Sequence, residues 1–159
     1  MIAINHLLST ASAYVILLES DIGFFYTLSI AHLPLVLIGA LLPDIDLPQS
    51  TVGRRVILLS KPINLIFGHR GAFHSVVACV ACYGLFSIID DVVALAVTFG
   101  YVSHLVGDMA TKAGTNLLWP ITKTRYRLPI LFARNSVFEY LSTALLTCYA
   151  FITVFGGSR

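Results

Sequence analysis

Charged residues are scarce in this sequence. Asp, Glu, Lys and Arg make up 11% of its 159 residues, whereas about 25% is usual in soluble domains. Hydrophobic residues reach 57%, and the mean hydropathy is +0.87. This composition argues against a soluble domain and predicts an integral membrane protein. The formal net charge is only +2, and no Lys/Arg-rich stripe could follow a phosphate backbone, so we expect no nucleic-acid binding.

Cysteine is also rare, and its positions do not indicate a disulfide framework. Cys79, Cys82 and Cys148 lie inside apolar runs. The pair Cys79-x-x-Cys82 is more typical of helix packing than of half a zinc motif. No repeat, low-complexity tract or linker divides the chain, so residues 1–159 are expected to form a single integral membrane domain. Residues 1–18 lack a basic region at their start, and we do not expect them to be a cleavable signal peptide.

Five apolar segments predict an all-α, polytopic membrane helix bundle. They run over residues 2–18, 24–42, 74–89, 92–106 and 137–155. The second and fifth approach the roughly 20 residues that a helix needs to cross a bilayer. The third and fourth are shorter and would cross only with local thinning or with a polar end drawn into the membrane. Those polar ends are His74 and His104.

The basic residues are distributed unevenly among the links between these segments. Two links carry only acidic charge, from Glu19, Asp21, Asp90 and Asp91. Nine of the ten basic residues lie in the other two links: Arg54, Arg55, Lys61, Arg70, Lys112, Lys123, Arg125, Arg127 and Arg134. The positive-inside rule therefore places the N-terminus and both basic links in the cytoplasm.

Histidine and aspartate gather at the segment ends that this topology places on the cytoplasmic side. The set comprises His6, Asp44, Asp46, His69, His74, His104 and Asp108. Imidazole and carboxylate are metal ligands, and beside hydrocarbon they are costly unless something pairs or coordinates them. His104 and Asp108 are four residues apart and share one helix face. We predict a site for a divalent metal that is shared between segments, with zinc favoured and manganese as the second option, because no thiolate takes part.

Three further polar residues can be explained without a role in the metal site or in catalysis. His32 lies 12 residues from Asp44, about 18 Å along a helix, and cannot join the same site. Ser75 follows His74 directly and points about 100° away on a helix, so a serine nucleophile is not expected. Glu139 is either a distant metal ligand or a carboxylate favoured by a helix N-terminus.

Three ordered blocks resemble the YdjM-like family. They are Leu42-Pro43-Asp44-Ile45-Asp46, Gly68-His69-Arg70-Gly71-Ala72-Phe73-His74-Ser75 and Gly100-Tyr101-Val102-Ser103-His104-Leu105-Val106-Gly107-Asp108. The likeness continues through Thr111, Gly114 and Leu117-Leu118-Trp119-Pro120. It implies a metal-dependent hydrolase of the bacterial inner membrane, in a family with some members regulated by LexA. Leu47 departs from the pattern, since the family often has histidine there, and this leaves the metal count open.

The order of the ligands is also similar to part of the scheme of zinc-dependent phospholipase C and related nucleases. The matching residues are His6, Asp44, His69 or His74, and His104 with Asp108, whereas the further His-x-x-x-Glu helix is absent. This likeness implies hydrolysis of a phosphoester, in a phospholipid or another membrane-associated substrate. Asp46 and Arg70 are then the candidate catalytic residues. The Arg70 guanidinium matches the geometry of phosphate, although it also fits as one more cytoplasmic charge.

Two hypotheses without catalysis stay open. A saturated tetrahedral metal site would be structural or regulatory, in a membrane protein that binds a cytoplasmic partner, whereas an open coordination position would favour the hydrolase. A transporter is less favoured, because no ionisable path crosses the bilayer beside the isolated His32.

Overall fold

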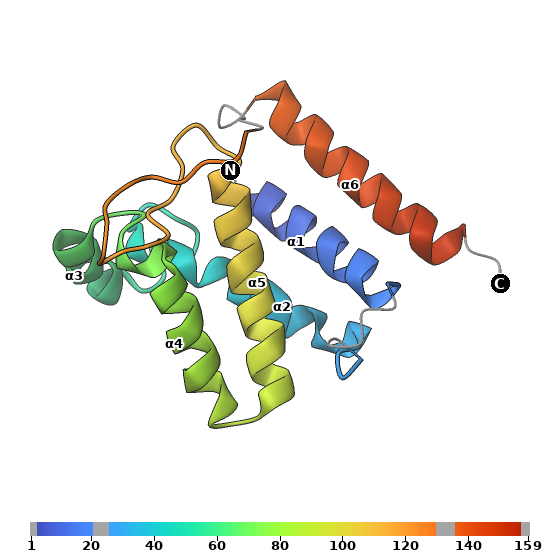
Figure 1. The fold of residues 1–159 in the computed structure, drawn as a ribbon, viewed down its shortest axis with the longest axis horizontal. Coiled ribbons are helices and arrows are strands. Elements are labelled where there is room, and N and C mark those ends of the chain that lie inside the picture. Colours follow the sequence, from blue (N-terminus) through green and yellow to red (C-terminus); the bar gives the residue numbers. More distant parts are fainter. Residues whose placement is uncertain (1–2, 21–25, 130–135, 157–159) are drawn as a thin grey trace.

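The computed structural model describes residues 3–20, 26–129 and 136–156. Within these ranges the chain is helical, and its one β-type contact is an isolated bridge between Thr115 and Tyr126. The predicted all-α class is therefore confirmed. The α-helices are α1 (Ala3–Leu18), α2 (Leu33–Leu41), α3 (Ile57–Phe67), α4 (Val76–Ser87), α5 (Asp91–Met109) and α6 (Val137–Phe155) (Figure 1). Three 3₁₀ turns join them: η2 (Ile30–His32), η3 (Pro43–Asp46) and η4 (Ala72–His74).

Two of the described helices, α5 and α6, are long and apolar enough to cross a membrane. Each has 19 residues. About 44% of the apolar window of α5 is buried, against 17% for α6, so α5 is central and α6 lies at the edge of the bundle. The remaining apolar helices α1, α3 and α4 are shorter, with 16, 11 and 12 residues.

The second apolar segment does not form the continuous helix that its composition predicts. Residues 26–29 are not helical, and α2 has only 9 residues; Phe24 and Phe25 lie outside the described residues. Pro34 stands in the first turn of α2, and Pro43 opens η3. Proline lacks a backbone N–H, so it is favoured in the first turn of a helix and usually disrupts the interior, although α3 accommodates Pro62. Pro34 therefore favours the observed start of α2, and Pro43 follows shortly after its end.

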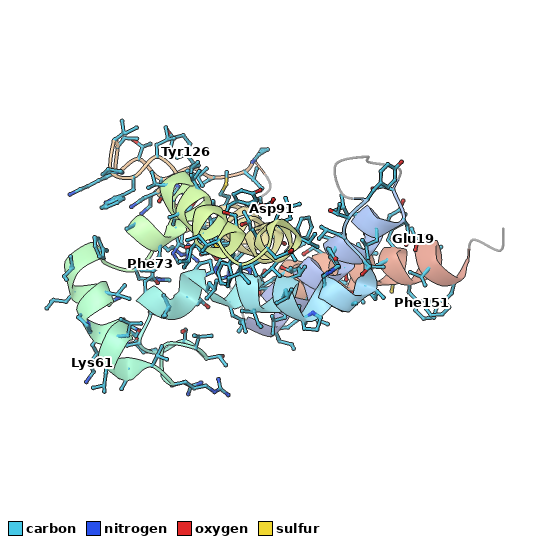
Figure 2. The ribbon with its side chains drawn as sticks, turned by 90° about the horizontal axis from the view of Figure 1, so that it is seen from below. Glu19, Lys61, Phe73, Asp91, Tyr126 and Phe151 are labelled. Carbon is cyan, nitrogen blue, oxygen red and sulfur yellow. The ribbon has the colours of Figure 1, made fainter. Side chains whose placement is uncertain are left out.

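The helix α3 lies in a link for which no helix was predicted. Its exposed side chains Leu58, Leu65 and Ile66 are 91%, 87% and 71% accessible, and their spacing places them on one helix face. On the other side Ser60 is buried, and Asn64 Nδ2 donates to the Asp46 carbonyl at 2.7 Å. Figure 2 shows Lys61 of this helix at the end of the molecule opposite Phe151 of α6. The segment is thus a short amphipathic helix attached to η3.

Two glycines allow the backbones of α2 and α5 to touch. A Cβ at Gly100 would lie 1.9 Å from the Val36 carbonyl oxygen, and one at Gly39 would lie 1.9 Å from the Val97 carbonyl oxygen. Small residues permit this close approach between helices in membranes. The contact brings the second half of α2 against the middle of α5.

The helices α1 and α6 run parallel and in register (Figure 1). Three polar pairs, each about one turn from the next, join them: Asn5 with Glu139 at 2.7 Å, Ser9 with Thr143 at 3.3 Å and Ser12 with Thr147 at 3.1 Å. Interhelical hydrogen bonds of this kind hold helices together where water is scarce. Both helices therefore begin at the same end of the bundle.

Candidate metal centre

The predicted ligands meet at the end of the bundle where α1 and α4 begin and α5 ends. Their positions are His6 in α1, Asp44 and Asp46 in η3, His69 after α3, His74 at the end of η4, and His104 and Asp108 in α5. All seven belong to one connected set of contacts. The structure thus brings these seven side chains together from sequence-distant segments, and their role as metal ligands stays a prediction.

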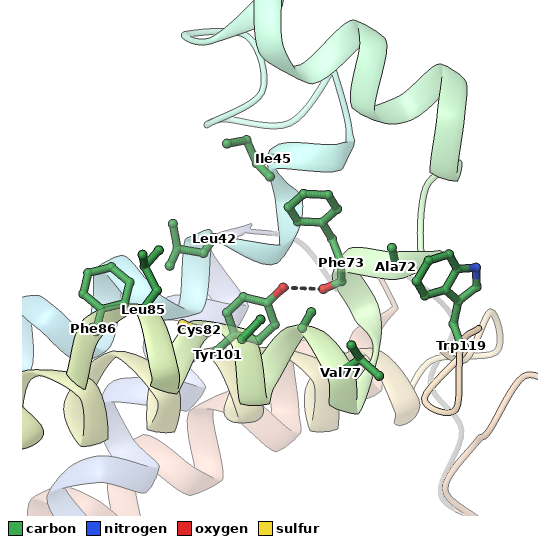
Figure 3. Close-up of a pocket in the computed structure, with 12 residues that line it drawn as sticks. Leu42, Ile45, Ala72, Phe73, Val77, Cys82, Leu85, Phe86, Tyr101 and Trp119 are labelled. Carbon is green, nitrogen blue, oxygen red and sulfur yellow. Dashed lines mark hydrogen bonds between the residues drawn. The ribbon is translucent and has the colours of Figure 1, made fainter. Parts of the chain in front are cut away.

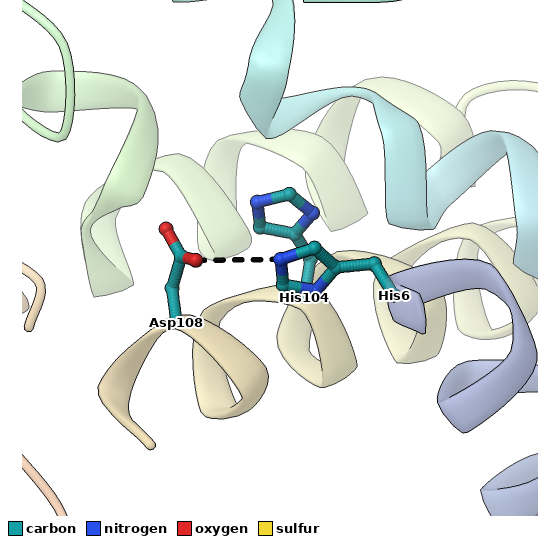
Figure 4. Close-up of side chains that lie close together, drawn as sticks. All are labelled: His6, His104 and Asp108. Carbon is teal, nitrogen blue, oxygen red and sulfur yellow. Dashed lines mark ion pairs between the residues drawn. The ribbon is translucent and has the colours of Figure 1, made fainter. Parts of the chain in front are cut away.

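His6, His104 and Asp108 form the part of the cluster between α1 and α5 (Figure 4). The His6 Nε2 atom lies 3.3 Å from Asp108 Oδ1. The rings of His6 and His104 are stacked, with centroids 4.1 Å apart and planes 8° from parallel. All three residues are at most 4% exposed. Their ligand atoms are close enough together to hold one metal ion.

The backbone of α2 fixes the tautomer of His104. The Nδ1 atom of His104 lies 2.7 Å from the Ala40 carbonyl oxygen. Ala40 is in the last turn of α2, where carbonyls have no intrahelical partner. A carbonyl only accepts, so the ring proton sits on Nδ1. The Nε2 atom then carries a lone pair. It points toward Asp44 Oδ1, 3.7 Å away.

A buried carboxylate fixes the tautomer of His74 in the same way. Asp46 Oδ2 lies 3.0 Å from His74 Nδ1, and Asp46 Oδ1 lies 2.8 Å from His69 Nδ1. The backbone N–H of Arg70 donates to Asp46 Oδ2 at 3.1 Å. Both oxygens of Asp46 are thus engaged, and His74 Nε2 is left with a lone pair. That atom lies 3.6 Å from Asp108 Oδ2.

The two free imidazole nitrogens are the decisive feature of the cluster. His74 Nε2 and His104 Nε2 are buried and have no hydrogen-bond partner within the part of the chain that the structure describes. Each faces a carboxylate oxygen, so lone pair faces lone pair. Buried polar atoms are normally satisfied, and a cation between these atoms would satisfy both. Histidine that donates its other N–H to a carboxylate or carbonyl is the usual arrangement of a metal-binding imidazole.

Three groups of side chains place their ligand atoms within 4.8 Å of one another. They are His6, His104 and Asp108; Asp44, His74 and His104; and Asp46, His69 and His74. The first two share His104, which offers one free nitrogen. In the third, the close atoms are already hydrogen-bonded to each other. The donor set of imidazole and carboxylate oxygen fits zinc, manganese or a related divalent ion.

The two carboxyl groups of η3 have opposite environments. Burial raises the pKa of Asp44, and the nearby Asp108 adds to the rise, while His6 and His74 oppose it. Burial also favours a higher pKa for Asp46, but the hydrogen bonds with His69 and His74 outweigh it and leave this pKa lowered. Asp46 is therefore a charged acceptor already supplied with donors, whereas for Asp44 burial outweighs the neighbouring histidines and its pKa stays raised.

Arg70 contacts both Asp46 and Asp108. Its φ of 65° is uncommon for a residue other than glycine and marks local strain. This conformation directs the backbone N–H to Asp46, while Nη2 of the side chain lies 2.9 Å from Asp108 Oδ1. The Nη1 atom donates to Gly114 O at 3.0 Å and to Thr111 Oγ1 at 3.3 Å. A guanidinium has five N–H donors, so these contacts do not exhaust it.

Other polar residues lie outside the converging ligand atoms. His32 accepts a hydrogen bond from Ser29 N at 3.0 Å in η2. Ser75 caps α4, where its hydroxyl accepts from Ala78 N. Glu139 accepts from Asn5 Nδ2 in the contact between α1 and α6. The cysteines Cys79 and Cys82 are free. These positions agree with the expectation that His32 and Ser75 take no part in the site and that the cysteine pair belongs to helix packing.

Two supports of the centre were missed by reasoning from the sequence. The Ala40 carbonyl orients His104, and no side chain reveals a backbone acceptor. Asn64 holds the backbone of Asp46. It lies one turn after Ser60 on the polar side of α3, and this spacing was the available sign of a buried polar helix face.

Comparison with known proteins identifies the family of the chain. The chain matches the family described as YdjM inner membrane protein over residues 1–158. The chain belongs to this family. It is 40% identical over 121 residues to inner membrane protein YdjM of Escherichia coli strain K12, and equally to that of Shigella flexneri. These alignments cover 70% of the chain and 61% of each relative.

The chain is also similar to a protein of Bacillus subtilis. The uncharacterized protein YvsG of Bacillus subtilis strain 168 is 38% identical over 125 residues, which cover 76% of this chain and 78% of YvsG. No solved structure matches the chain. Because the chain spans about three fifths of the length of the first two relatives, their full activities are not transferred to it. Family membership and the two apolar helices together indicate an inner-membrane protein.

Proposed function

We propose that this YdjM-family chain is a membrane-embedded, metal-dependent hydrolase of a phosphoester. The observation that carries the proposal is a pair of buried nitrogens, His74 Nε2 and His104 Nε2, which have no hydrogen-bond partner among the described residues and face the carboxylates of Asp108 and Asp44. This arrangement supports a metal site, and the donor set supports zinc first and manganese second.

The residues divide into ligands and supports. His74, His104, Asp44 and Asp108 offer the ligand atoms, and His6 adds another nitrogen beside Asp108. Supports of the ligands are Asp46, which orients His74, and the Ala40 carbonyl, which orients His104. His69 lies on the solvent side, where its 31% exposed side chain bonds the same Asp46.

The chemistry follows from this division. A bound divalent metal supplies Lewis acidity and lowers the pKa of a water molecule. Arg70 keeps Asp108 in place and has further N–H donors, which suit a phosphate oxygen. Asp46 acts by holding the His74 ring and by keeping its proton on Nδ1. The buried position of the centre limits access of bulk water.

We extend the proposal to topology. The five apolar segments of the sequence would form a multi-pass bundle with a cytoplasmic N-terminus, and the centre would lie at the cytoplasmic face. The nine basic residues in two links support this orientation. The helices α1, α4 and α6 begin at the end of the bundle where α5 ends. This shared position supports the placement of all ligands at one face.

The test is metal-dependent hydrolysis by the purified chain in detergent. A chelator should abolish turnover of a bis-aryl or lipid phosphodiester, and zinc or manganese should restore it. Asp108→Asn should abolish activity. Arg70→Lys should chiefly raise KM, because a point charge attracts phosphate but does not bind it bidentately. His32→Ala is the matched histidine control and should behave like wild type. A metal-loaded protein that is inert toward all phosphoesters would favour a structural or regulatory metal instead.

A further inference from the structure

An apolar groove runs beside α4, on the other side of the segments that carry the metal ligands. It encloses about 400 Å³, within the roughly 300–1,000 Å³ typical of ligand pockets. Leu42, Ala78, Ala81, Leu85, Phe86 and Trp119 are among the residues that line it (Figure 3). Its surface is hydrocarbon and aromatic ring almost throughout. A sugar, nucleotide or other hydrophilic ligand would find no partners along it.

The wall of this groove is continuous with the metal centre. Ile45 lines the groove between Asp44 and Asp46, and Phe73 lines it directly before His74. Tyr101, one helical turn before His104, also lines it and donates its hydroxyl proton to the Phe73 carbonyl. The same short segments therefore present metal ligands on one side and apolar side chains on the other.

Two aromatic residues of the groove lining are in contact with α3. Phe67, at the end of α3, packs edge-on against Phe73 and Trp119, with centroids 6.3 Å and 5.8 Å apart. The exposed apolar face of α3 and its neighbours Arg54, Arg55 and Lys61 form the pattern of a helix that lies in a membrane interface. This pattern supports a position of Phe73 and Trp119 at the depth where lipid headgroups meet acyl chains.

We propose that the groove binds an acyl chain of a lipid phosphoester, so that the lipid's phosphate lies at the metal centre beside Arg70. The inference rests on the proposed hydrolase and names its substrate class. Charge complementarity favours this occupant, because Ile45 and Phe73 of the apolar lining directly adjoin residues of the candidate metal centre, where Arg70 is cationic and a bound metal would add positive charge. An anionic head with a hydrocarbon tail matches both ends.

Chain-length dependence of hydrolysis is the first test. Butyl, octyl and dodecyl esters of one aryl phosphate present the same reacting group with tails of different length. For wild type, kcat/KM should rise at least about tenfold from butyl to octyl, since each methylene removed from water favours binding. Ala81→Phe fills the groove and should remove this rise, so that the kcat/KM values of this variant for the octyl and dodecyl esters fall close to its own value for the butyl ester. Val80→Phe, on the exposed neighbouring position of α4, should keep the rise.

A binding measurement separates the groove from the chemistry. Trp119 lines the groove and is the single tryptophan of the chain, so a brominated dodecyl phosphate in the groove should quench its fluorescence. Quenching should saturate in wild type and Val80→Phe, and should need about tenfold more ligand in Ala81→Phe. A brominated dodecanol of the same tail should bind more weakly, because it lacks the anionic head.

The outcomes distinguish the two proposals. Saturable quenching without hydrolysis of any phosphoester would support the groove as an acyl-chain site and would overturn the proposed hydrolase function. Hydrolysis with equal kcat/KM for all tail lengths, together with quenching that is unsaturable and identical in the three proteins, would retain the hydrolase and overturn the groove as an acyl-chain site.

Discussion

The imidazole rings of His6 and His104 lie stacked, with centroids 4.1 Å apart and planes 8° from parallel. The two residues are distant in sequence, and the stack joins the start of α1 to the last turns of α5. Neutral imidazole is the form that binds a metal, and the Asp108 side chain lies beside the stack, with His6 Nε2 3.3 Å from Asp108 Oδ1. The His6 side chain thus offers two things: a ring that packs against His104 and a nitrogen that can bind a metal.

Substitutions of His6 separate these two parts. His6→Phe keeps an aromatic ring against His104 but removes the nitrogen, so metal affinity should fall while the metal-free protein keeps nearly wild-type thermal stability. His6→Ala removes both, and should also lower stability by about 1 kcal/mol from the lost ring contact. Metal content by mass spectrometry and unfolding midpoints in detergent measure the two effects. Equal metal affinity in all three proteins would remove His6 from the centre.

The glycine contact between α2 and α5 should control the centre from a distance. In Gly100→Ala, the added methyl group has no room against the Val36 carbonyl, so the helices must separate and the His104–Ala40 hydrogen bond must lengthen. We expect a loss of about 1–3 kcal/mol of stability and weaker metal binding.

A second glycine provides the control for this substitution. Gly84, in α4, has open space around its Cβ position, and Gly84→Ala should stabilise the helix by up to about 1 kcal/mol. Titration with zinc and chemical unfolding of both variants compare the two sites. Gly100→Ala with wild-type stability and affinity would show that the close approach is unnecessary.

Hydrophobic runs predicted the long helices better than the interrupted ones. The bounds of α6 are those of the predicted segment, residues 137–155. The helix α5 continues three residues beyond its predicted end, because the polar Asp108 is buried in the centre and does not face water. Within the described residues the second segment is helical only from η2 onward, with Pro34 in the first turn of α2, and the apolar period of α3 was hidden in a link with several charges. Arg134 and Arg159 lie outside the described residues.

The members of the metal cluster were accessible to sequence reasoning, but their roles were not. Residue type and position at segment ends suffice to group His74, His104 and Asp108. The division into ligands and supports depends on which nitrogen carries a proton, and this is set by Asp46 for one ring and by the Ala40 carbonyl for the other. Such partners come from tertiary contacts between turns and helices, which no local pattern specifies.

The role of Asp46 can be tested through metal affinity. Asp46→Asn keeps the size of the side chain but weakens its hydrogen bonds with the rings of His69 and His74. If Asp46 orients His74, zinc affinity should fall about 10–100-fold without disappearing. Asp91→Asn, at the exposed start of α5, is the control and should leave affinity unchanged. Complete loss of zinc in Asp46→Asn, equal to that in a His104→Ala protein, would make Asp46 a ligand itself.

Glu139 provides a test of the boundary of the centre. Its Oε1 atom accepts from Asn5 Nδ2 in the polar contact between α1 and α6. Glu139→Gln preserves a carbonyl oxygen for this bond and should retain full metal content. Glu139→Leu leaves the buried Asn5 amide without this acceptor and should destabilise the protein by about 1–3 kcal/mol. Loss of metal in the glutamine variant at unchanged stability would identify Glu139 as a ligand.

The orientation in the membrane is tested by labelling single cysteines. In a background without Cys79, Cys82 and Cys148, cysteine is placed at Lys123, in a basic link, or at Ile89, in the turn between α4 and α5; both positions are exposed. A membrane-impermeant maleimide should label position 89 in intact spheroplasts and position 123 only after lysis, because the basic links stay in the cytoplasm. The turn at Ile89 and the ligands at the start of α4 lie at opposite ends of that helix. Labelling of position 123 from outside would therefore move the whole metal centre to the outer face of the membrane.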